Sequence, residues 1–202
     1  MSATTSFAVT WDYRCPFARN AHEYLLDALA GGAGWDVTFV PFFLDTSHVD
    51  PDGPPAWELP DKIPNLLSLE AGVVVRDRFP ELFPAVHRSL FAARHDDGSD
   101  LRDRSVVAGA LTRAGADADA VLAEVDAGWP RKLARAEHEQ VVDDLDVFGV
   151  PTFLLGGQGV FVRLMDRPAG DTVKARATIE RVLGLIVDHP EINEFKHTRI
   201  AR

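Results

Sequence analysis

The segment Trp11-Asp12-Tyr13-Arg14-Cys15-Pro16-Phe17-Ala18 joins a predicted strand to a predicted helix, and it carries the one cysteine of the chain. Before it, Phe7, Val9 and Trp11 alternate with Ala8 and Thr10, which predicts a short strand. After it, apolar residues recur at helical spacing, and Pro16 suits the first helical turn because its missing N–H costs nothing there. The segment therefore places a thiol between the end of a strand and the start of a helix.

A second strand follows the helix. The helix is predicted to end at Gly31-Gly32, and alternation of side chains then begins again. The alternating residues are Trp35, Val37, Phe39 and Pro41. A strand-helix-strand unit of this length fits a crossover that joins two parallel strands.

The middle of the chain is predicted to be mainly helical. A loop rich in Pro, Asp and Gly runs from Asp45 to about Leu59. Apolar residues at helical spacing then predict four helices, of which the first contains Phe79, Phe83, Val86 and Leu90, and the others begin after Asp103, after Asp117 and at Pro130. The last of these is predicted to carry Leu133, Val141, Leu145 and Phe148 on one face.

The end of the chain predicts a hairpin and a final helix. Residues 150–155 and 160–164 are predicted strands around a glycine-rich turn at 156–159, and a helix follows Asp171 and ends at His189-Pro190. The fold class is therefore α/β, with a helical insertion between a β-α-β half and a β-β-α half. We expect a domain made of residues 1–44 and 149–190, an insertion at 45–148 and a tail at 191–202. In the tail, the residues expected to pack back on the body are Ile192, Phe195 and Ile200.

The composition excludes several classes of protein. One cysteine in 202 residues cannot form an internal disulfide, nor can it supply a zinc site built from two CxxC motifs. A net charge of −10 predicts an acidic surface that repels nucleic acid. No apolar run approaches the ~20 residues of a membrane span, and residues 1–6 lack the pattern of a signal peptide. We therefore expect a cytoplasmic protein whose thiol stays reduced.

The position of Cys15 favours reactive chemistry. A thiol at a helix N-terminus faces unpaired N–H groups and the positive end of the helix dipole, and both favour the thiolate. Cysteines placed in this way have pKa values of roughly 3.5 to 7.5, against ~8.5 for a free thiol. Arg14 and Arg19 are predicted to add positive charge nearby. The alternative interpretation is that Cys15 is a small buried hydrophobic residue.

A second signal lies at Val150-Pro151-Thr152. A proline at the start of a strand is either a device that protects a sheet edge or a cis bond that turns the chain sharply. Alone, this proline is weak evidence for a site. In combination with a Cys-Pro pair at a strand-helix junction, it becomes strong evidence.

Together, the Cys15 segment, the helical block and Phe148-Gly149-Val150-Pro151-Thr152-Phe153 resemble the DsbA family of thioredoxin-fold oxidoreductases, in its cytosolic, actinobacterial-type branch. Mycothiol-dependent nitroreductases and the 2-hydroxychromene-2-carboxylate isomerases and kappa glutathione transferases are related to that branch. The resemblance covers Phe7 to about Val187 and implies a thioredoxin-like fold with a helical insertion. It matches Cys15 to the attacking, solvent-facing cysteine, Pro16 and Phe17 to the variable pair after it, Pro151 to the cis-proline that faces the cysteine, and Val150 to the residue whose backbone pairs with a bound thiol.

The chain departs from that family at position 18, where the CxxC motif would place its resolving cysteine and this sequence has Ala18. One thiol cannot store two electrons as an internal disulfide. We therefore expect monothiol chemistry, in which an external low-molecular-weight thiol resolves a mixed disulfide at Cys15. No metal and no tightly bound cofactor are expected, and mycothiol and glutathione are the candidate small thiols. The expected partners are a small-molecule thiol or disulfide, a protein thiol or a second copy of the chain, but no nucleic acid and no membrane.

Several other residues are candidates for the site. Phe17 and Trp57 are the aromatic residues expected to reach the cleft, and Arg14 and Arg19 are candidate binding residues. His22 is interpreted as a packing residue, whereas His87, His95 and His138 are candidates to line a pocket in the insertion, with surface or capping roles as the alternative. The loop 163–168 is interpreted as solvated, with the alternative that its basic residues bind a carboxylate of the cofactor.

Two other functions remain open at this stage. In one, Cys15 positions a thiol cofactor for conjugation or isomerisation, as the resemblance to the kappa transferase group implies, where a serine at the matching position holds the thiolate of the cofactor. In the other, the chain is a non-enzymatic thioredoxin-like protein that binds a ligand or senses thiols.

Overall fold

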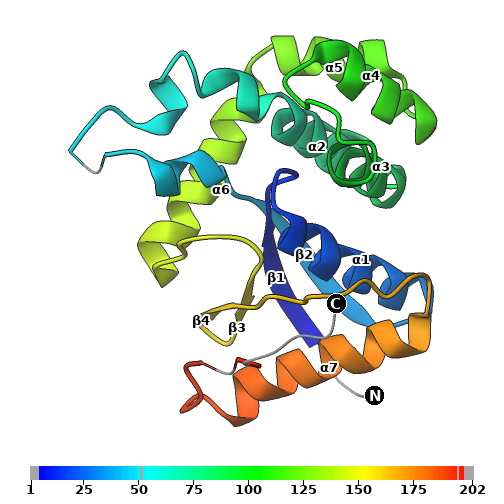
Figure 1. Cartoon of the computed structure of the whole chain (residues 1–202), viewed down its shortest axis with the longest axis vertical. Helices are drawn as coiled ribbons and strands as arrows, with labels where there is room; N and C mark the ends of the chain where they lie inside the picture. The colour runs from blue at the N-terminus through cyan, green and yellow to red at the C-terminus, as the bar shows by residue number, and fades with distance from the viewer. Residues whose placement is uncertain (1–4, 51, 195, 198–202) are drawn as a thin grey trace.

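A four-stranded sheet with the order β2-β1-β3-β4 lies at the centre of one half of the molecule (Figure 1). The structure is a computed structural model, and it describes residues 5–50, 52–194 and 196–197. β1 (Thr5–Trp11) pairs in parallel with β2 (Trp35–Pro41), and α1 (Pro16–Ala30) connects these two strands. β3 (Thr152–Leu155) lies antiparallel to both β1 and β4 (Gln158–Phe161). The predicted parallel pair and the predicted hairpin are therefore confirmed.

The part of the chain between β2 and β3 is helical, and this confirms the α/β fold class with a helical insertion. Three short 3-10 helices come first, followed by five α-helices. The 3-10 helices are η1 (Leu44–His48), η2 (Ala56–Glu58) and η3 (Ile63–Leu66), and the α-helices are α2 (Leu67–Arg78), α3 (Phe83–His95), α4 (Arg104–Arg113), α5 (Ala118–Asp126) and α6 (Trp129–Leu145). α7 (Thr172–Asp188) follows β4. In Figure 1, α2 to α5 lie above the sheet, and α6 runs back down toward it.

Three helices begin at the aspartates where the sequence predicts them. The carboxylates of Asp103, Asp117 and Asp171 each accept a hydrogen bond from a backbone N–H in the first turn of α4, α5 and α7 respectively. Such a cap satisfies a donor that the helix itself leaves unpaired, and it contributes about 1 kcal/mol to stability. These starting points could be predicted because the signal is local in the sequence.

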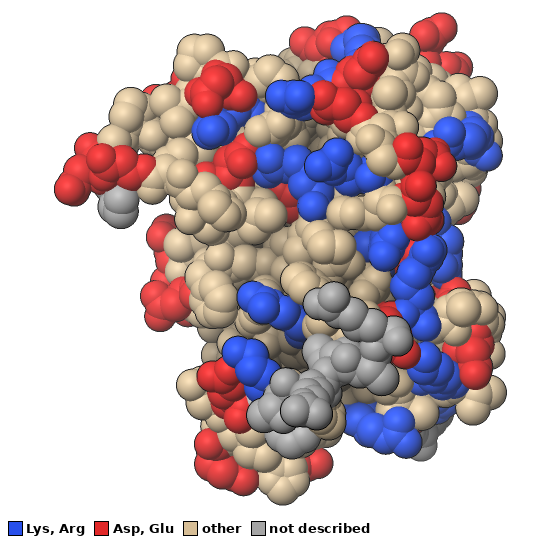
Figure 2. Space-filling model, in the orientation of Figure 1, with Lys and Arg blue, Asp and Glu red and all other residues tan. Residues whose placement is uncertain are grey.

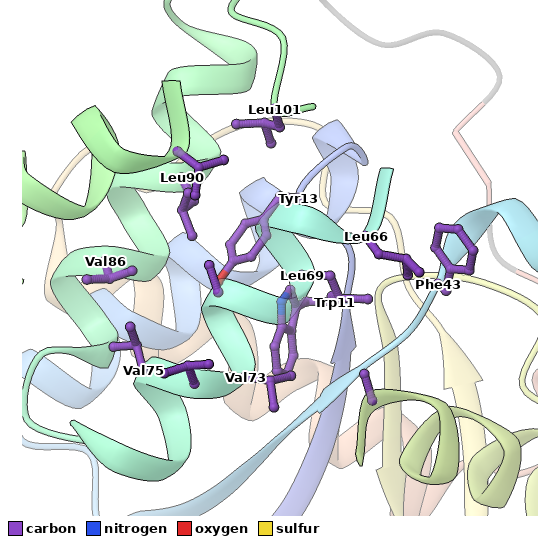
Figure 3. Close-up of a cluster of buried hydrophobic side chains, with 14 of the residues drawn as sticks. Trp11, Tyr13, Phe43, Leu66, Leu69, Val73, Val75, Val86, Leu90 and Leu101 are labelled. Atoms are coloured by element: carbon purple, nitrogen blue, oxygen red, sulfur yellow. The ribbon is translucent and has the colours of Figure 1, made fainter. Parts of the chain in front are cut away.

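Two apolar clusters hold the fold together. One lies between the sheet and the pair α1 and α7, and its buried members include Phe7, Val9, Tyr24, Phe153 and Ile179. The other fills the insertion and also contains Trp11 and Tyr13, which come from the end of β1 and the loop after it. Figure 3 shows these two side chains among residues of α2 and α3, including Leu69, Val75, Val86 and Leu90. The insertion therefore shares its core with the segment that leads to Cys15.

The helix α2 is not predicted by the sequence analysis, which places the first helix of the insertion around Phe79 to Leu90. The residues of α2 from Ser68 to Val75 are all buried, so the helix lacks the alternation between a polar and an apolar face on which such a prediction depends. Gly72 allows the close approach of Tyr13, since a Cβ atom at position 72 would lie 2.5 Å from the phenolic oxygen.

Three local expectations differ from the structure. α6 ends at Leu145, and Phe148 beyond it is 67% exposed instead of continuing the buried face of the helix. β4 begins at Gln158 rather than at Val160, because Gly156 and Gly157, with φ of 61° and 77°, form a two-residue turn in place of a longer one. In the tail, Ile192 is 46% exposed, whereas Phe195 and Ile200 lie outside the described residues.

None of the helices that the structure describes is both long enough and apolar enough to cross a membrane.

The contact between Gly72 and Tyr13 predicts the effect of adding one methyl group. Gly72→Ala should lower the free energy of unfolding by about 1–3 kcal/mol, because the new Cβ overlaps a fully buried ring that cannot move freely. The matched control is Gly109→Ala in α4, where a Cβ meets nothing within 4 Å and a gain of up to ~1 kcal/mol is expected. Urea denaturation of both variants checks this. Equal stability of the wild type and Gly72→Ala would contradict the packing.

Candidate active site

Cys15 is the N-cap residue of α1, directly after the loop that follows β1. The backbone N–H of Cys15 donates to the carbonyl oxygen of Asp12 at 3.1 Å, and that of Arg14 donates to the Asp12 carboxylate at 2.9 Å. Cys15 has the extended conformation of an N-cap, with φ −92° and ψ 118°, and Pro16 follows in the first turn. The chain therefore turns tightly and presents the thiol at the start of the helix.

The thiol of Cys15 contacts the backbone of the segment that follows the insertion in the sequence. Its Sγ donates a hydrogen bond to the carbonyl oxygen of Val150 at 3.3 Å, although the two residues lie 135 positions apart. The peptide bond between Val150 and Pro151 is cis. The carbonyl oxygen of Pro151 in turn accepts from the backbone N–H of Val162 at 3.1 Å. The two motifs quoted from the sequence are thus in direct contact.

Two buried threonines hold the loop before β3 against β1. The hydroxyl of Thr10 donates to the carbonyl oxygen of Gly149 and accepts from the backbone N–H of Thr152 at 2.9 Å. The hydroxyl of Thr152 donates to the same carbonyl oxygen at 2.8 Å. These bonds fix the residues immediately before Val150 relative to β1.

The expected lowering of the pKa of Cys15 is wrong in direction. Burial raises the pKa of this thiol, and the backbone N–H groups of Ala18 and Phe17 lower it by less than burial raises it. The side chain is only 8% exposed, so the negative thiolate loses most of its hydration. The helix N-terminus acts as predicted, but the cost of desolvation exceeds its effect. The implied solvent-facing cysteine is therefore largely covered in this structure.

Arg14 and Arg19 do not supply the positive charge that was predicted for them. The guanidinium of Arg14 pairs with Asp12 and Asp45, at 2.9 Å from each. Arg19 pairs with Asp96 at 2.8 Å. Carboxylates therefore compensate both cations. Asp12 is close to Arg14 in the sequence, but Asp45 and Asp96 lie far along the chain, so these two pairs had no local signal.

Arg163 is the cation that lowers the pKa of Cys15. It lies in the loop that the sequence analysis interpreted as solvated or, alternatively, as binding a carboxylate of the cofactor. Its guanidinium carbon lies 5.2 Å from the ring centroid of Phe17 and 5.1 Å from that of Phe161. Phe17 is partly exposed and Pro16 is exposed, so both lie at the accessible side of the helix start. The order of residues along the chain gave no signal for this arrangement, because it depends on the pairing of β4 with β3.

Trp57 does not reach the cleft as expected. It is 6% exposed and packs against Phe43 and His138 inside the insertion. His138 accepts a hydrogen bond from the backbone N–H of Phe43 at 3.3 Å, and burial lowers its pKa to about 4. Both side chains are therefore part of the core.

A buried chain of hydrogen bonds runs from Tyr13 through two histidines to β1. The Tyr13 hydroxyl lies 2.8 Å from His87 Nδ1, His87 Nε2 lies 2.9 Å from His22 Nδ1, and His22 Nε2 lies 3.0 Å from the carbonyl oxygen of Thr10. Because a carbonyl oxygen only accepts, His22 Nε2 carries the proton. His87 Nε2 must then donate to His22, and Tyr13 must donate to His87. The interpretation of His22 as a packing residue agrees with this geometry.

The three histidines of the insertion that were candidates to line a pocket are held by contacts within the protein. His87 and His138 are buried, and His95 Nε2 lies 2.9 Å from the carbonyl oxygen of Tyr13. This contact ties the end of α3 to the loop before Cys15. Within the part of the chain that the structure describes, no group of three or more His, Cys, Asp or Glu side chains is placed to hold a metal ion.

The comparisons with known proteins agree with this architecture. A family model described as a DSBA-like thioredoxin domain matches residues 75–174. The chain has a thioredoxin-like fold of the DsbA type. The matched region contains most of the insertion and the Val150–Pro151 segment, but it begins after Cys15. No curated protein matches the chain in sequence.

Solved structures match over nearly the whole length of the chain. A 2-hydroxychromene-2-carboxylate isomerase has a TM-score of 0.61 at 17% identity, and the match covers 91% of this chain and 98% of that chain. The cytosolic disulfide reductase DsbM from Pseudomonas aeruginosa, solved with GSH, has a TM-score of 0.60 at 18% identity, with 88% and 98% covered. A probable DsbA oxidoreductase from Streptomyces coelicolor has a TM-score of 0.59 at 16% identity, with 95% and 93% covered. At these identities the likeness shows the shared fold.

The buried histidines predict that stability falls in mildly acidic solution. Burial lowers the pKa of His22 and His138 from 6.5 to about 4, so the unfolded chain binds more protons than the folded chain between these values. The free energy of unfolding should therefore decrease from pH 7 to pH 5 by roughly 2 kcal/mol for each histidine. Urea denaturation across this range checks this. The exposed His48 serves as the control, since His48→Gln should keep the same slope, and a flat profile would contradict the prediction.

The burial of Cys15 predicts a slow reaction with alkylating reagents near neutral pH. The rate with iodoacetamide should still be rising at pH 8.5, because the pKa of the buried thiol is raised. The matched reference is the same chain unfolded in urea, whose thiol should titrate at a lower pH than that of the folded chain. A rate that is already constant below pH 7 would contradict the assignment.

Proposed function

We propose that the protein is a monothiol thiol-disulfide oxidoreductase, acting as a thiol transferase, with Cys15 as its nucleophile. The observation that carries the proposal is the contact between the Cys15 thiol and the carbonyl oxygen of Val150, next to the cis bond to Pro151. This contact brings the two motifs of a DsbA-like fold together around one sulfur atom. Ala18 supplies no second thiol, so the reaction uses one sulfur of the protein at a time.

The reaction consists of two exchanges that leave the protein unchanged. First, the Cys15 thiolate attacks one sulfur of a disulfide, so that a mixed disulfide with Cys15 forms while the original S–S bond breaks and the other thiolate leaves. Second, an external thiolate attacks the mixed disulfide, which releases a new disulfide and restores the Cys15 thiolate. Each step breaks one S–S bond and forms one, so no further oxidant or reductant is needed.

The pKa of Cys15 favours one direction of this exchange. A strong disulfide oxidant requires a stabilised thiolate in its reduced form, whereas burial raises the pKa of Cys15. Without a stabilised thiolate to release, the mixed disulfide at Cys15 is a weak oxidant, so the excess of the external thiol drives its resolution. This supports thiol transfer or disulfide reduction rather than the oxidation of folding proteins.

The proposed setting is the cytoplasm, and the proposed external thiol is glutathione or mycothiol. A reducing compartment supplies such a thiol in excess, as monothiol chemistry requires. A cytosolic disulfide reductase solved with GSH shares the fold, which supports this choice.

One observation favours a second candidate function. Because its pKa is raised, Cys15 keeps its proton and acts as a hydrogen-bond donor, as its bond to Val150 shows. A donor at this position could hold the thiolate of a bound cofactor, so that the protein would catalyse conjugation or isomerisation without forming a disulfide. The shared fold with an isomerase supports this alternative.

Incubation with glutathione disulfide, followed by intact-protein mass spectrometry, tests the proposal. The wild type should gain the mass of one glutathione, and Cys15→Ser should gain none. Reduction of 2-hydroxyethyl disulfide by glutathione should fall more than about 100-fold in Cys15→Ser, because the nucleophile is lost. Absence of an adduct on the wild type would refute thiol transfer, and turnover of an electrophile by Cys15→Ser would support the second candidate.

A matched variant tests the monothiol assignment separately. Ala18→Cys restores the spacing of a CxxC motif at a buried position one turn into α1. In this variant the glutathione adduct should be replaced by an internal disulfide, which is two mass units lighter than the reduced chain. If the adduct on this variant is as abundant as on the wild type, position 18 does not face the sulfur as the motif requires.

A further inference from the structure

The segment that contains Arg163 is hydrogen-bonded both to Pro151 and to the helix α1 that begins after Cys15. On one side of Arg163, the backbone N–H of Val162 donates to the carbonyl oxygen of Pro151 at 3.1 Å. On the other side, the carbonyl oxygen of Leu164 accepts from the side-chain amide of Asn20 in α1 at 2.8 Å. Asn20 is only 6% exposed, so this anchor is buried. Arg163 is therefore tied to the cis-proline segment and to the helix of Cys15.

The guanidinium of Arg163 is held by aromatic rings rather than by carboxylates. Its central carbon lies 5.2 Å from the centroid of Phe17 and 5.1 Å from that of Phe161. Phe17 is two residues after Cys15, so the cation stands beside the start of α1. Contacts with ring faces leave the N–H groups at the edge of the guanidinium available to an acceptor.

Other cations near the site differ from Arg163 in this respect. Arg14 and Arg19 have carboxylate partners, and Figure 2 shows many basic side chains on this face lying next to acidic ones. Among the described residues, Arg163 has neither an ion-pair partner nor a hydrogen-bond acceptor for its side chain, and the residue is exposed. In an acidic chain with net charge −10, an uncompensated cation at this place is notable.

We propose that Arg163 binds the anionic group of the thiol or disulfide on which Cys15 acts. The substrate class is then a thiol or disulfide that carries a carboxylate within a few bonds of its sulfur. This inference rests on the proposed function. A planar guanidinium can receive both oxygens of a carboxylate, which fixes the orientation of the substrate as well as its position. Of the two candidate small thiols, glutathione carries carboxylates, whereas mycothiol, a sugar-linked thiol, carries none.

The test compares three disulfides that differ in charge. Glutathione disulfide is anionic, 2-hydroxyethyl disulfide is neutral, and cystamine is cationic. The second-order rate of adduct formation on Cys15 is measured for each by intact-protein mass spectrometry. In the wild type, glutathione disulfide should react faster than cystamine. In Arg163→Gln, the ratio of the rate with glutathione disulfide to the rate with 2-hydroxyethyl disulfide should fall about 10-fold or more.

The ratio is the diagnostic quantity because Arg163 also acts on the thiol itself. Its charge lowers the pKa of Cys15, so its removal should slow all three probes alike and leave the ratio unchanged if that were its only role. Arg163→Lys should give an intermediate ratio, because it keeps the charge but loses the planar geometry. Arg176→Gln is the matched control. Arg176 lies in α7 and pairs with Glu180, and its removal should leave all three rates unchanged.

Two results would overturn the inference. If Arg163→Gln keeps the wild-type ratio, Arg163 does not recognise the anion, and adducts on Cys15 would still support the proposed function. If the wild type forms no adduct with any of the three probes, the proposed function itself fails, and the inference fails with it.

Discussion

The buried hydrogen bonds from Tyr13 through His87 and His22 to Thr10 determine how the two halves of the molecule fit together. They join the loop before Cys15, the helices α3 and α1, and the strand β1. Each group donates to the next, so one arrangement of protons gives every polar atom in this series of hydrogen bonds a partner. Removing one member would leave another buried group without a partner, which costs about 1–3 kcal/mol. The insertion is thus bonded to the segment that carries the thiol, and Thr10, whose carbonyl oxygen ends this series of bonds, also holds the loop before Val150 through its hydroxyl.

The positive charge that acts on the Cys15 thiol comes from a cation without a carboxylate partner within the described part of the chain, and not from every cation close to the site. Burial raises the pKa of Cys15 more than the start of α1 lowers it. Arg14 pairs with Asp12 and Asp45, so it contributes little net charge at the thiol. Arg163 has only aromatic neighbours for its guanidinium among the described residues, and its field therefore reaches the sulfur. Such a site suits the proposed reaction of Cys15 with a thiol or disulfide that carries a negative charge.

The sequence predicted the parts of the structure whose signals are local. The strand before Cys15, the helix after it, the aspartate caps and the glycine turn each depend on residues within a few positions of one another. The helix α2 was missed because it is buried on every side, and Trp57 was misplaced because its neighbours Phe43 and His138 come from distant segments. The charge expected from Arg14 and Arg19 was misjudged in part for the same reason, whereas the alternative interpretation of loop 163–168 left a binding role for Arg163 open. Asp12, one partner of Arg14, lies only two residues away, but Asp45, Asp96 and the rings around Arg163 are placed by the packing of the insertion and the pairing of β4, which no short stretch of sequence encodes.

Because the chain has no second thiol, the second step of the proposed reaction needs a thiol from outside the protein. Ala18 is fully buried in the same cluster as Cys15, so the helix supplies apolar packing where a CxxC protein would hold its resolving sulfur. A thiol that releases a mixed disulfide must therefore come from solvent. Cys15 is 8% exposed, whereas Pro16 is exposed and Phe17 is partly exposed beside it. The guanidinium of Arg163 lies beside Phe17, so the proposed recognition of a negative charge would occur at the same end of α1 as the sulfur.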